Sequence, residues 1–97
     1  AFMAKSIPSS GAGAVRIILK NKEAFHFDLR ERNEENGKQS YLFDVYYENT
    51  IGTLNVLMDH DEPVIAALNL SLGKVITLSN DTNLKKLCVY CINQVNS

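Results

Sequence analysis

The sequence lacks an excess of charge of either sign. Its 97 residues include 10 lysines and arginines against 11 aspartates and glutamates, which gives a formal net charge of −1. Without a strong field the chain has no general means of attracting nucleic acid or anionic lipid, so we expect no nucleic-acid partner. Such binding would require a local basic stripe, which Arg30, Arg32, Lys85 and Lys86 would form only if the fold brought them together.

Long apolar runs are also missing. A membrane-spanning helix needs about 20 consecutive apolar residues, and the longest candidate stretches in this chain are interrupted by Asn69, Ser71 and Gly73. We therefore expect a soluble protein that does not insert into a membrane. No internal repeat or low-complexity tract is visible, and the 45% hydrophobic content of a chain of this length predicts one compact core.

The first residues differ in composition from the rest. Residues 1–14 contain Pro8, neighbouring serines and two glycines, and their apolar section is too short for the core of a signal peptide. We interpret residues 1–14 as a flexible linker or a remnant of the expression vector. Residues 15–97 are expected to form a single α+β domain.

Cysteine is scarce, since the chain has only Cys88 and Cys91. Their C-x-x-C spacing occurs in zinc sites and in thiol redox centres. Both lie inside a segment of helical periodicity, however, whereas a redox pair needs its first thiol at a helix N-terminus. Only His26 and His60 are available as further non-acidic zinc ligands. We interpret the cysteines as packed core thiols, assign no metal and no cofactor, and expect an intracellular, cytoplasmic protein.

Alternation of apolar and polar residues predicts most of a sheet. The pattern predicts strands at residues 15–20, 24–30, 41–47, 51–59 and 74–79. We expect the first two to pair as a hairpin around a turn at 21–23. The charged stretch 31–39, which contains Asn36 and Gly37, is expected to be an exposed loop between strands.

Two of these strands carry further detail. In 41–47 both faces are partly apolar, because Leu42 and Tyr46 alternate with a second apolar set, so we expect an interior strand or one whose outer face meets another molecule. That second set is Tyr41, Phe43, Val45 and Tyr47. In 51–59 we expect Gly52 at a bulge. The inward-facing residues of 51–59 are expected to be Leu54, Val56 and Met58.

The segment from residue 61 to residue 73 permits two interpretations. Asp61 and Pro63 are typical of a helix start and Gly73 of a helix stop, which would give a second short helix at 62–72. Alternation in the second half of the segment favours a strand instead. The alternating residues are Leu68, Leu70 and Leu72. Both interpretations stay open at this point.

The end of the chain has the clearest pattern. Asn80, Asp81 and Thr82 are capping residues, and the apolar residues after them follow the spacing of one helical stripe. The stripe consists of Leu84, Leu87, Cys88, Cys91, Ile92 and Val95. The fold class expected is therefore α+β: a mostly antiparallel sheet of about five strands, with one face covered by an amphipathic C-terminal helix.

A sheet closed by one C-terminal helix resembles the layout of pleckstrin-homology-like and polo-box-like modules. The chain contains no tryptophan, which is typical of the helix in the former, and its strands lack the motifs of the latter. The resemblance concerns layout alone, and layout does not fix function.

Two groups of polar residues are candidates for chemistry. His26 and Asp28 lie two apart on one predicted strand and project to the same face, as a hydrogen-bonded acid–base pair would. The segment Asp59–Glu62, which includes His60, is the densest cluster of potential metal ligands, although it is equally typical of a solvated turn. A small enzyme or metal-dependent domain would require the two groups to meet. This is the alternative functional hypothesis.

Surplus aromatic and apolar surface favours a different function. Val89 and Tyr90 flank the helical stripe, and we expect that Tyr41, Tyr46 and Tyr47 do not all enter one small core. Half-exposed tyrosine is enriched at protein interfaces. We therefore expect no catalysis, but a protein–protein interaction or self-association module, such as a homodimer, that binds through a sheet edge or a tyrosine-bearing face. The candidate binding residues are Tyr46, Tyr47, Val89 and Tyr90.

Overall fold

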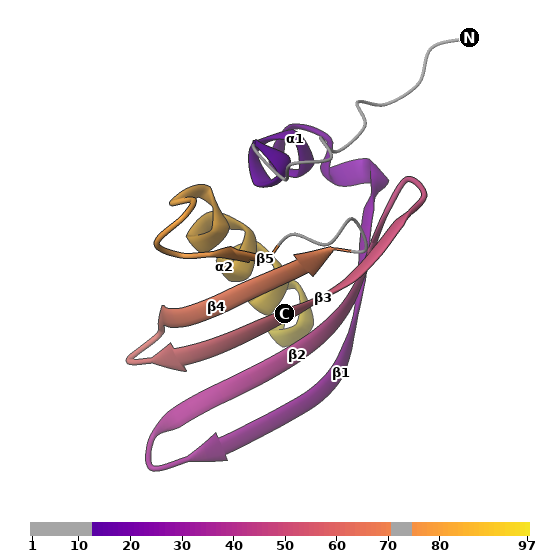
Figure 1. Ribbon diagram of the computed structural model, residues 1–97. Coiled ribbons are helices and arrows are strands. Elements are labelled where there is room, and N and C mark those ends of the chain that lie inside the picture. The colour runs from indigo at the N-terminus through magenta and orange to yellow at the C-terminus, as the bar shows by residue number, and fades with distance from the viewer. Residues whose placement is uncertain (1–12, 71–74) are drawn as a thin grey trace, which may run out of the picture.

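A computed structural model describes residues 13–70 and 75–97 (Figure 1). Its helices are α1 (Ala14–Lys20) and α2 (Asn83–Asn96), with a 3-10 turn at Lys22–Ala24. The strands are β1 (Phe25–Glu35), β2 (Lys38–Tyr47), β3 (Thr50–Asp59), β4 (Glu62–Leu70) and β5 (Val75–Thr77). They form one antiparallel sheet in the order β1-β2-β3-β4-β5. The predicted α+β class is confirmed.

The sheet has two unlike faces. The inner face carries the buried alternate residues and packs against α2, which lies behind the sheet in Figure 1. The helical stripe predicted from the sequence supplies the other half of this core, and five of its six residues are buried while Val95 is half-buried. The N-cap of α2 is Thr82, which forms no side-chain capping hydrogen bond. The preceding Asp81 accepts a hydrogen bond from the Asn83 backbone N–H at its Oδ1, at 2.9 Å.

Strands β2 and β3 follow the predicted alternation. In β2 the buried residues are Tyr41, Phe43, Val45 and Tyr47, and in β3 they are Leu54, Val56 and Met58. Each strand pairs on both sides, so both are interior to the sheet. The other side of the sheet carries Leu42, Asn55 and Ala67, which are directly paired across β2, β3 and β4. We call this side the outer face.

The prediction of a strand at residues 15–20 is wrong, because this segment is the helix α1. Its apolar residues fit either period, and packing decides between them. Ala14, Val15 and Ile18 are buried at helical spacing where α1 contacts α2. The expected hairpin between this segment and 24–30 is therefore wrong as well. Residues 1–12 of the predicted linker lie outside the described residues, whereas Ala14 belongs to the core.

The prediction of a loop at 31–39 is also wrong. Strand β1 runs to Glu35 and β2 starts at Lys38, joined by a two-residue turn with φ of 55° at Asn36 and 79° at Gly37. An Asn-Gly pair is favoured in such hairpin turns because both positions need positive φ. The charged side chains of this hairpin end are exposed, and the half-buried positions on β2 are the uncharged Gln39 and Ser40. Strand pairing therefore does not require a charge to enter the core.

Residues 62–70 form strand β4, so the alternative of a short helix at 62–72 is not realised. The alternation determines the outcome: Ala66, Leu68 and Leu70 are all buried on the inner face. A tight turn at His60 and Asp61, with φ of 55° and 66°, joins β4 to β3. Residues 71–74 lie outside the described residues, and the predicted strand 74–79 is realised as the three-residue β5.

Gly52 is not at a bulge, contrary to the prediction. The register of β3 and β4 shifts between Leu57 and Met58, which places the extra residue, Val64, in β4. Gly52 is required for a different reason, since a Cβ at this position would overlap the backbone oxygen of Asn69. The two strands therefore approach too closely here for any side chain.

Among the described residues, no helix combines the length and the apolar composition needed to cross a bilayer.

Candidate functional site

The structure separates the two groups of candidate catalytic residues. His26 and Asp28 lie on the outer face of β1, and His26 pairs with Tyr46 at the β2 end that leads into β3. His60 lies in the turn after β3, at the opposite end of the sheet. The eight residue-to-residue steps from Ile51 to Asp59 separate these ends by about 26 Å, because a strand rises about 3.3 Å per residue.

The acidic segment around His60 is a solvated turn. His60 Nδ1 lies 2.7 Å from Asp59 Oδ1, and the His60 side chain is 94% exposed. Glu62 Oε1 binds Lys85 Nζ at 2.9 Å, which links the start of β4 to the first turn of α2. Within residues 13–70 and 75–97, no three His, Cys, Asp or Glu side chains are grouped to hold a metal ion. These residues have structural partners but no shared site.

The two cysteines are packed core thiols, as the sequence predicted. Cys88 and Cys91 are free and fully buried on the inner side of α2. Burial raises the pKa of Cys88 from 9.0 to about 12, because the thiolate loses hydration. Burial also raises the pKa of Cys91, with a smaller contribution from the charge of Cys88. Neither thiol is available as a nucleophile at neutral pH.

The four predicted binding residues lie in three different environments. Tyr46 is on the outer face and 38% exposed. Tyr47 is only 2% exposed, and its hydroxyl accepts a hydrogen bond from Asn21 Nδ2 at 3.0 Å. Val89 and Tyr90 are half-buried on α2, on the opposite side of the sheet from Tyr46.

Tyr90 has partners within the chain. Its ring meets the ring of Phe27 edge-on at 5.9 Å, and Lys22 Nζ lies 4.9 Å from the ring centroid on another side. These contacts hold the start of the 3-10 turn and the start of β1 against α2. Residues of the same domain thus already cover part of the Tyr90 ring, while Tyr46 is more open to solvent.

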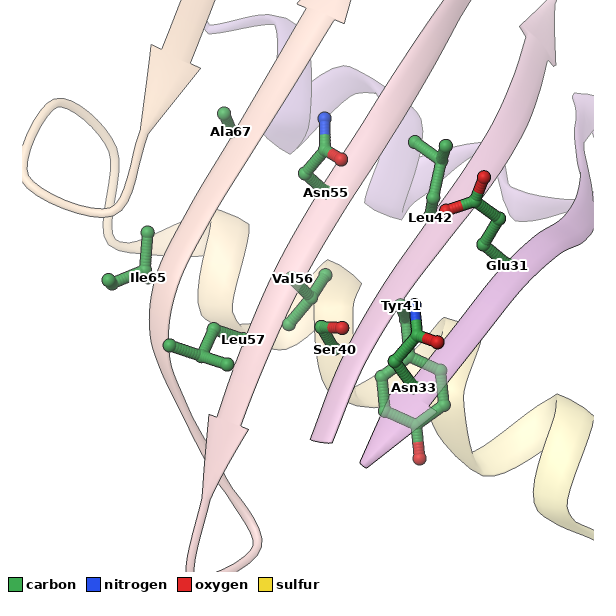
Figure 2. Close-up of a pocket in the computed structure, with 10 residues that line it drawn as sticks. All are labelled: Glu31, Asn33, Ser40, Tyr41, Leu42, Asn55, Val56, Leu57, Ile65 and Ala67. Atoms are coloured by element: carbon green, nitrogen blue, oxygen red, sulfur yellow. The ribbon is translucent and has the colours of Figure 1, made fainter. Parts of the chain in front are cut away.

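The outer face contains a shallow hollow that the sequence did not identify (Figure 2). Its volume is about 250 Å³, and it opens to solvent at the centre of β2, β3 and β4. Leu42, Leu57, Ile65 and Ala67 supply its apolar surface, with Glu31 at the β1 side. The remaining lining residues are Asn33, Ser40, Tyr41, Asn55 and Val56.

Register explains how the hollow forms. Leu57 pairs with Ile65, and the neighbouring outer row places Leu42 and Ala67 on either side of Asn55. The sequence signal was present in Leu42, which made both faces of its strand apolar. Ile65 was missed because its segment fitted helix and strand equally, so its outward direction was not defined.

Large apolar side chains are unusually open on this face. Ile65 is 63% exposed at the hollow, and Ile51 is 60% exposed opposite Tyr46 near the other end of the strands. Val75 on β5 is exposed as well. No described element covers any of them. Apolar side chains grouped around an open hollow, as at Ile65, are typical of an interaction site.

Charge on the outer face lies along the β1 side and at the end of the sheet near His60, where Lys38 pairs with Asp59. Asp28 and Glu31 lie on β1, and Asp28 is directly opposite Asp44 of β2. Arg30 Nε lies 3.2 Å from Asp44 Oδ2 and compensates that one carboxylate. In contrast, the outer positions from Ile51 to Leu57 and from Ile65 to Asn69 carry no charge, so β3 and β4 are uncharged at the centre of the face. Those uncharged positions are Ile51, Thr53, Asn55, Leu57, Ile65, Ala67 and Asn69.

Both edges of the sheet are poorly suited to accept another strand. The register of β1 shifts between Leu29 and Glu31, so Arg30 forms a bulge in a strand dense in charge. The other edge consists of β5, which is only three residues long, and of the part of β4 that β5 leaves unpaired. That part of β4 contains Pro63, which has no N–H to donate, and the extra residue Val64. Bulges, charges and proline are the features that prevent edge-to-edge pairing.

The chain was compared with protein-family models, with curated proteins and with solved structures. None of the three comparisons found a match. The chemistry of the outer face is therefore the basis for assigning a function.

Proposed function

We propose that this domain is a non-catalytic interaction module that binds another protein through the outer face of its sheet. One observation carries the proposal: Leu42, Leu57 and Ile65 are gathered around a hollow on a face that no described element covers. Of these three residues Ile65 is the most exposed, at 63%, while Leu42 and Leu57 are half-buried. Burying such surface against a partner is favourable at about 25 cal/mol per Å² of apolar area.

The size of the hollow favours a side chain over a small molecule as its occupant. Pockets that enclose small ligands have volumes of about 300–1,000 Å³ and bury most of the ligand. The hollow on the outer face has about 250 Å³ and is open. The alternative of a small enzyme using His26, Asp28 and the Asp59–Glu62 segment has no support from the geometry, since these groups lie at opposite ends of the sheet.

A different protein is favoured over a second copy as the partner. Consider a dimer in which two outer faces pack together about a two-fold axis. If the axis runs across the strands, β1 of one copy lies against β1 of the other, and Asp28 and Glu31 of the two copies come close together. An axis along the strands would place these carboxylates against the uncharged half. The first arrangement places carboxylates against each other, and the second removes them from water without providing a cation, so both are unfavourable.

The compartment remains part of the proposal. Free thiols that are buried and protonated, such as those of Cys88 and Cys91, are the usual state in a reducing environment. We place the module inside the cell, in the cytoplasm. Fluorescence microscopy of the tagged protein in its native cells checks this location.

The experiment that tests the function uses two matched isoleucines. Ile65 and Ile51 are 63% and 60% exposed on the same face, but only Ile65 lines the hollow. Quantitative affinity capture from the native source is carried out with wild-type, Ile65→Ser and Ile51→Ser baits. We expect a partner whose recovery falls about tenfold with Ile65→Ser, since an apolar anchor contributes 1–2 kcal/mol or more, and changes little with Ile51→Ser.

Two results would contradict the proposal. One is a partner set that is the same for the wild-type and Ile65→Ser baits. The other is a partner lost on substitution of Val89 or Tyr90 while Ile65→Ser retains it, which would move the interface to α2. Light scattering of the isolated domain reports a monomer if the favoured partner is another protein, and a concentration-dependent dimer if it is a second copy.

A further inference from the structure

We infer that the partner presents a basic amphipathic helix, which lies on the outer face with one large apolar side chain in the hollow and lysine or arginine along its β1 flank. The inference rests on the proposed function and specifies its ligand. Three features carry it: the paired backbone of the sheet, the shape of the hollow, and the carboxylates along β1.

The backbone of the sheet determines which secondary structure fits. β2, β3 and β4 form the centre of the outer face, and β2 and β3 are paired on both sides. An extended segment lying on this face would find no backbone partners there, and its own N–H and C=O groups would lose water without compensation. A helix satisfies these groups internally. Strand addition at either edge is opposed by the bulges at Arg30 and Val64 and by Pro63.

The hollow determines the contact residue. Leu42, Leu57 and Ile65 line the hollow together with Ala67, whose side chain is the smallest among the lining residues. A space of about 250 Å³ receives one large apolar side chain from a helix. The inner face already shows that this sheet packs against an amphipathic helix, because α2 buries Leu84 and Leu87 against it.

The charges on the outer face determine where the partner carries basic residues. Glu31 lines the hollow on its β1 side, and Asp28 lies farther along the same face. Among the described residues neither carboxylate forms an ion pair, whereas Asp44 is compensated by Arg30. A cation on the partner would therefore find free carboxylates on the β1 flank. The opposite flank, formed by β4 and β5, offers apolar and amide side chains between Ile65 and Asn69.

The test uses two synthetic helical peptides of about 18 residues, a length of about 27 Å. Both carry leucines at helical i, i+3, i+4 and i+7 spacing. One has lysines beside the leucine stripe and the other has glutamates at the same positions. Binding is followed by calorimetry and by backbone amide NMR shifts. We expect binding of the lysine peptide alone, with the largest shifts at Leu42, Leu57 and Ile65, and weaker binding as salt is raised.

A matched pair of charge reversals locates the cation. Glu31→Lys and Glu34→Lys change the net charge equally on the same exposed strand, but Glu31 faces outward beside Leu42 and Glu34 pairs with Gln39 on the other side. We expect Glu31→Lys to weaken the lysine peptide about tenfold, and Glu34→Lys to weaken it less than about threefold, because only the first replaces an attraction by a repulsion at the contact.

The outcomes separate this inference from the proposed function. Equal binding of the two peptides, or shifts confined to α2 or to the β1 edge, would overturn the basic helix. If neither peptide binds but Ile65→Ser abolishes capture of the native partner, the basic helix is wrong and the interaction face stands. If Ile65→Ser leaves the captured proteins unchanged, the interaction face itself is wrong, whatever the peptides do.

Discussion

The side-chain amide of Asn21 donates a hydrogen bond to the hydroxyl of Tyr47, with 3.0 Å between the two heavy atoms and 26 positions of sequence between the residues. Asn21 directly follows α1, and Tyr47 is the buried last residue of β2. The bond joins the segment between α1 and the 3-10 turn to one end of the sheet. A tyrosine that the sequence placed among the binding residues thus contributes to the position of the N-terminal helix.

Removal of this hydroxyl is expected to destabilise the domain. Tyr47→Phe removes the acceptor for Asn21 and keeps the buried ring, so the free energy of unfolding should fall by about 1 kcal/mol. Tyr46→Phe is the matched control, because Tyr46 is adjacent in sequence and exposed on the other face. Urea unfolding followed by circular dichroism measures both. Equal losses for the two variants would mean that the Tyr47 hydroxyl has no special role.

Stability should decrease at alkaline pH because of the buried thiols. The folded-state pKa of Cys88 is raised from 9.0 to about 12, so the protonated thiol is favoured in the folded chain. This contribution is complete below pH 9.0, where both states are protonated, and is lost as the pH rises towards 12 and the unfolded chain ionises first. The free energy of unfolding should fall more steeply above pH 9.0 in the wild type than in a Cys88→Ala, Cys91→Ala variant.

The same burial predicts slow thiol chemistry. A thiolate-specific reagent at mildly alkaline pH should label neither Cys88 nor Cys91 in the folded domain, and should label both rapidly in denaturant. The rate of labelling in the folded state then reports opening of α2. Fast labelling without denaturant would contradict a packed position for these residues.

Gly52→Ala is expected to be among the more damaging single-methyl additions. The added Cβ would overlap the backbone oxygen of Asn69, and backbone in a paired strand has little freedom to move. A loss of about 2–3 kcal/mol is expected, as for overpacked cores. Gly37→Ala is the comparison: nothing lies within 4 Å of its added Cβ, and its cost of about 1 kcal/mol comes from the positive φ alone. Thermal unfolding ranks the two variants.

Arg30 and the two carboxylates near it should behave as a coupled set. Asp28 and Asp44 oppose each other across β1 and β2, and Arg30 lies 3.2 Å from Asp44. Arg30→Gln should cost up to about 1 kcal/mol at low salt, and less once Asp28→Asn removes the repulsion. A double-mutant cycle in urea measures the coupling. Additive effects at low salt would show that the carboxylates do not interact.

The regions that the sequence predicted well are those where one period extends over many residues. The stripe from Leu84 to Val95 and the alternation from Tyr41 to Tyr47 each admit a single structure, and both are confirmed. The predictions were wrong for segments whose pattern fits both a helix and a strand. Apolar residues are so dense between Val15 and Leu19 that strand and helix both bury a face, and only contact with α2 selects the helix.

Charge misled the prediction around Glu31 to Gln39. Charged residues are typical of loops in a small domain, but a hairpin whose side chains remain largely in solvent accommodates them without burial. The hollow required still more information. Leu42, Leu57 and Ile65 come from three strands, and their convergence depends on register, which includes a bulge at Val64 that no local pattern indicates.

The two bulged edges have a consequence for stoichiometry. A sheet that could extend at β1 or β4 would add subunits without limit, and its assemblies would grow with concentration. Arg30 and Pro63 oppose such growth, so under the proposed function each copy of the domain would bind one partner at its outer face. The proposed function therefore predicts a limited complex, in which the number of occupied partner sites cannot exceed the number of copies of the domain.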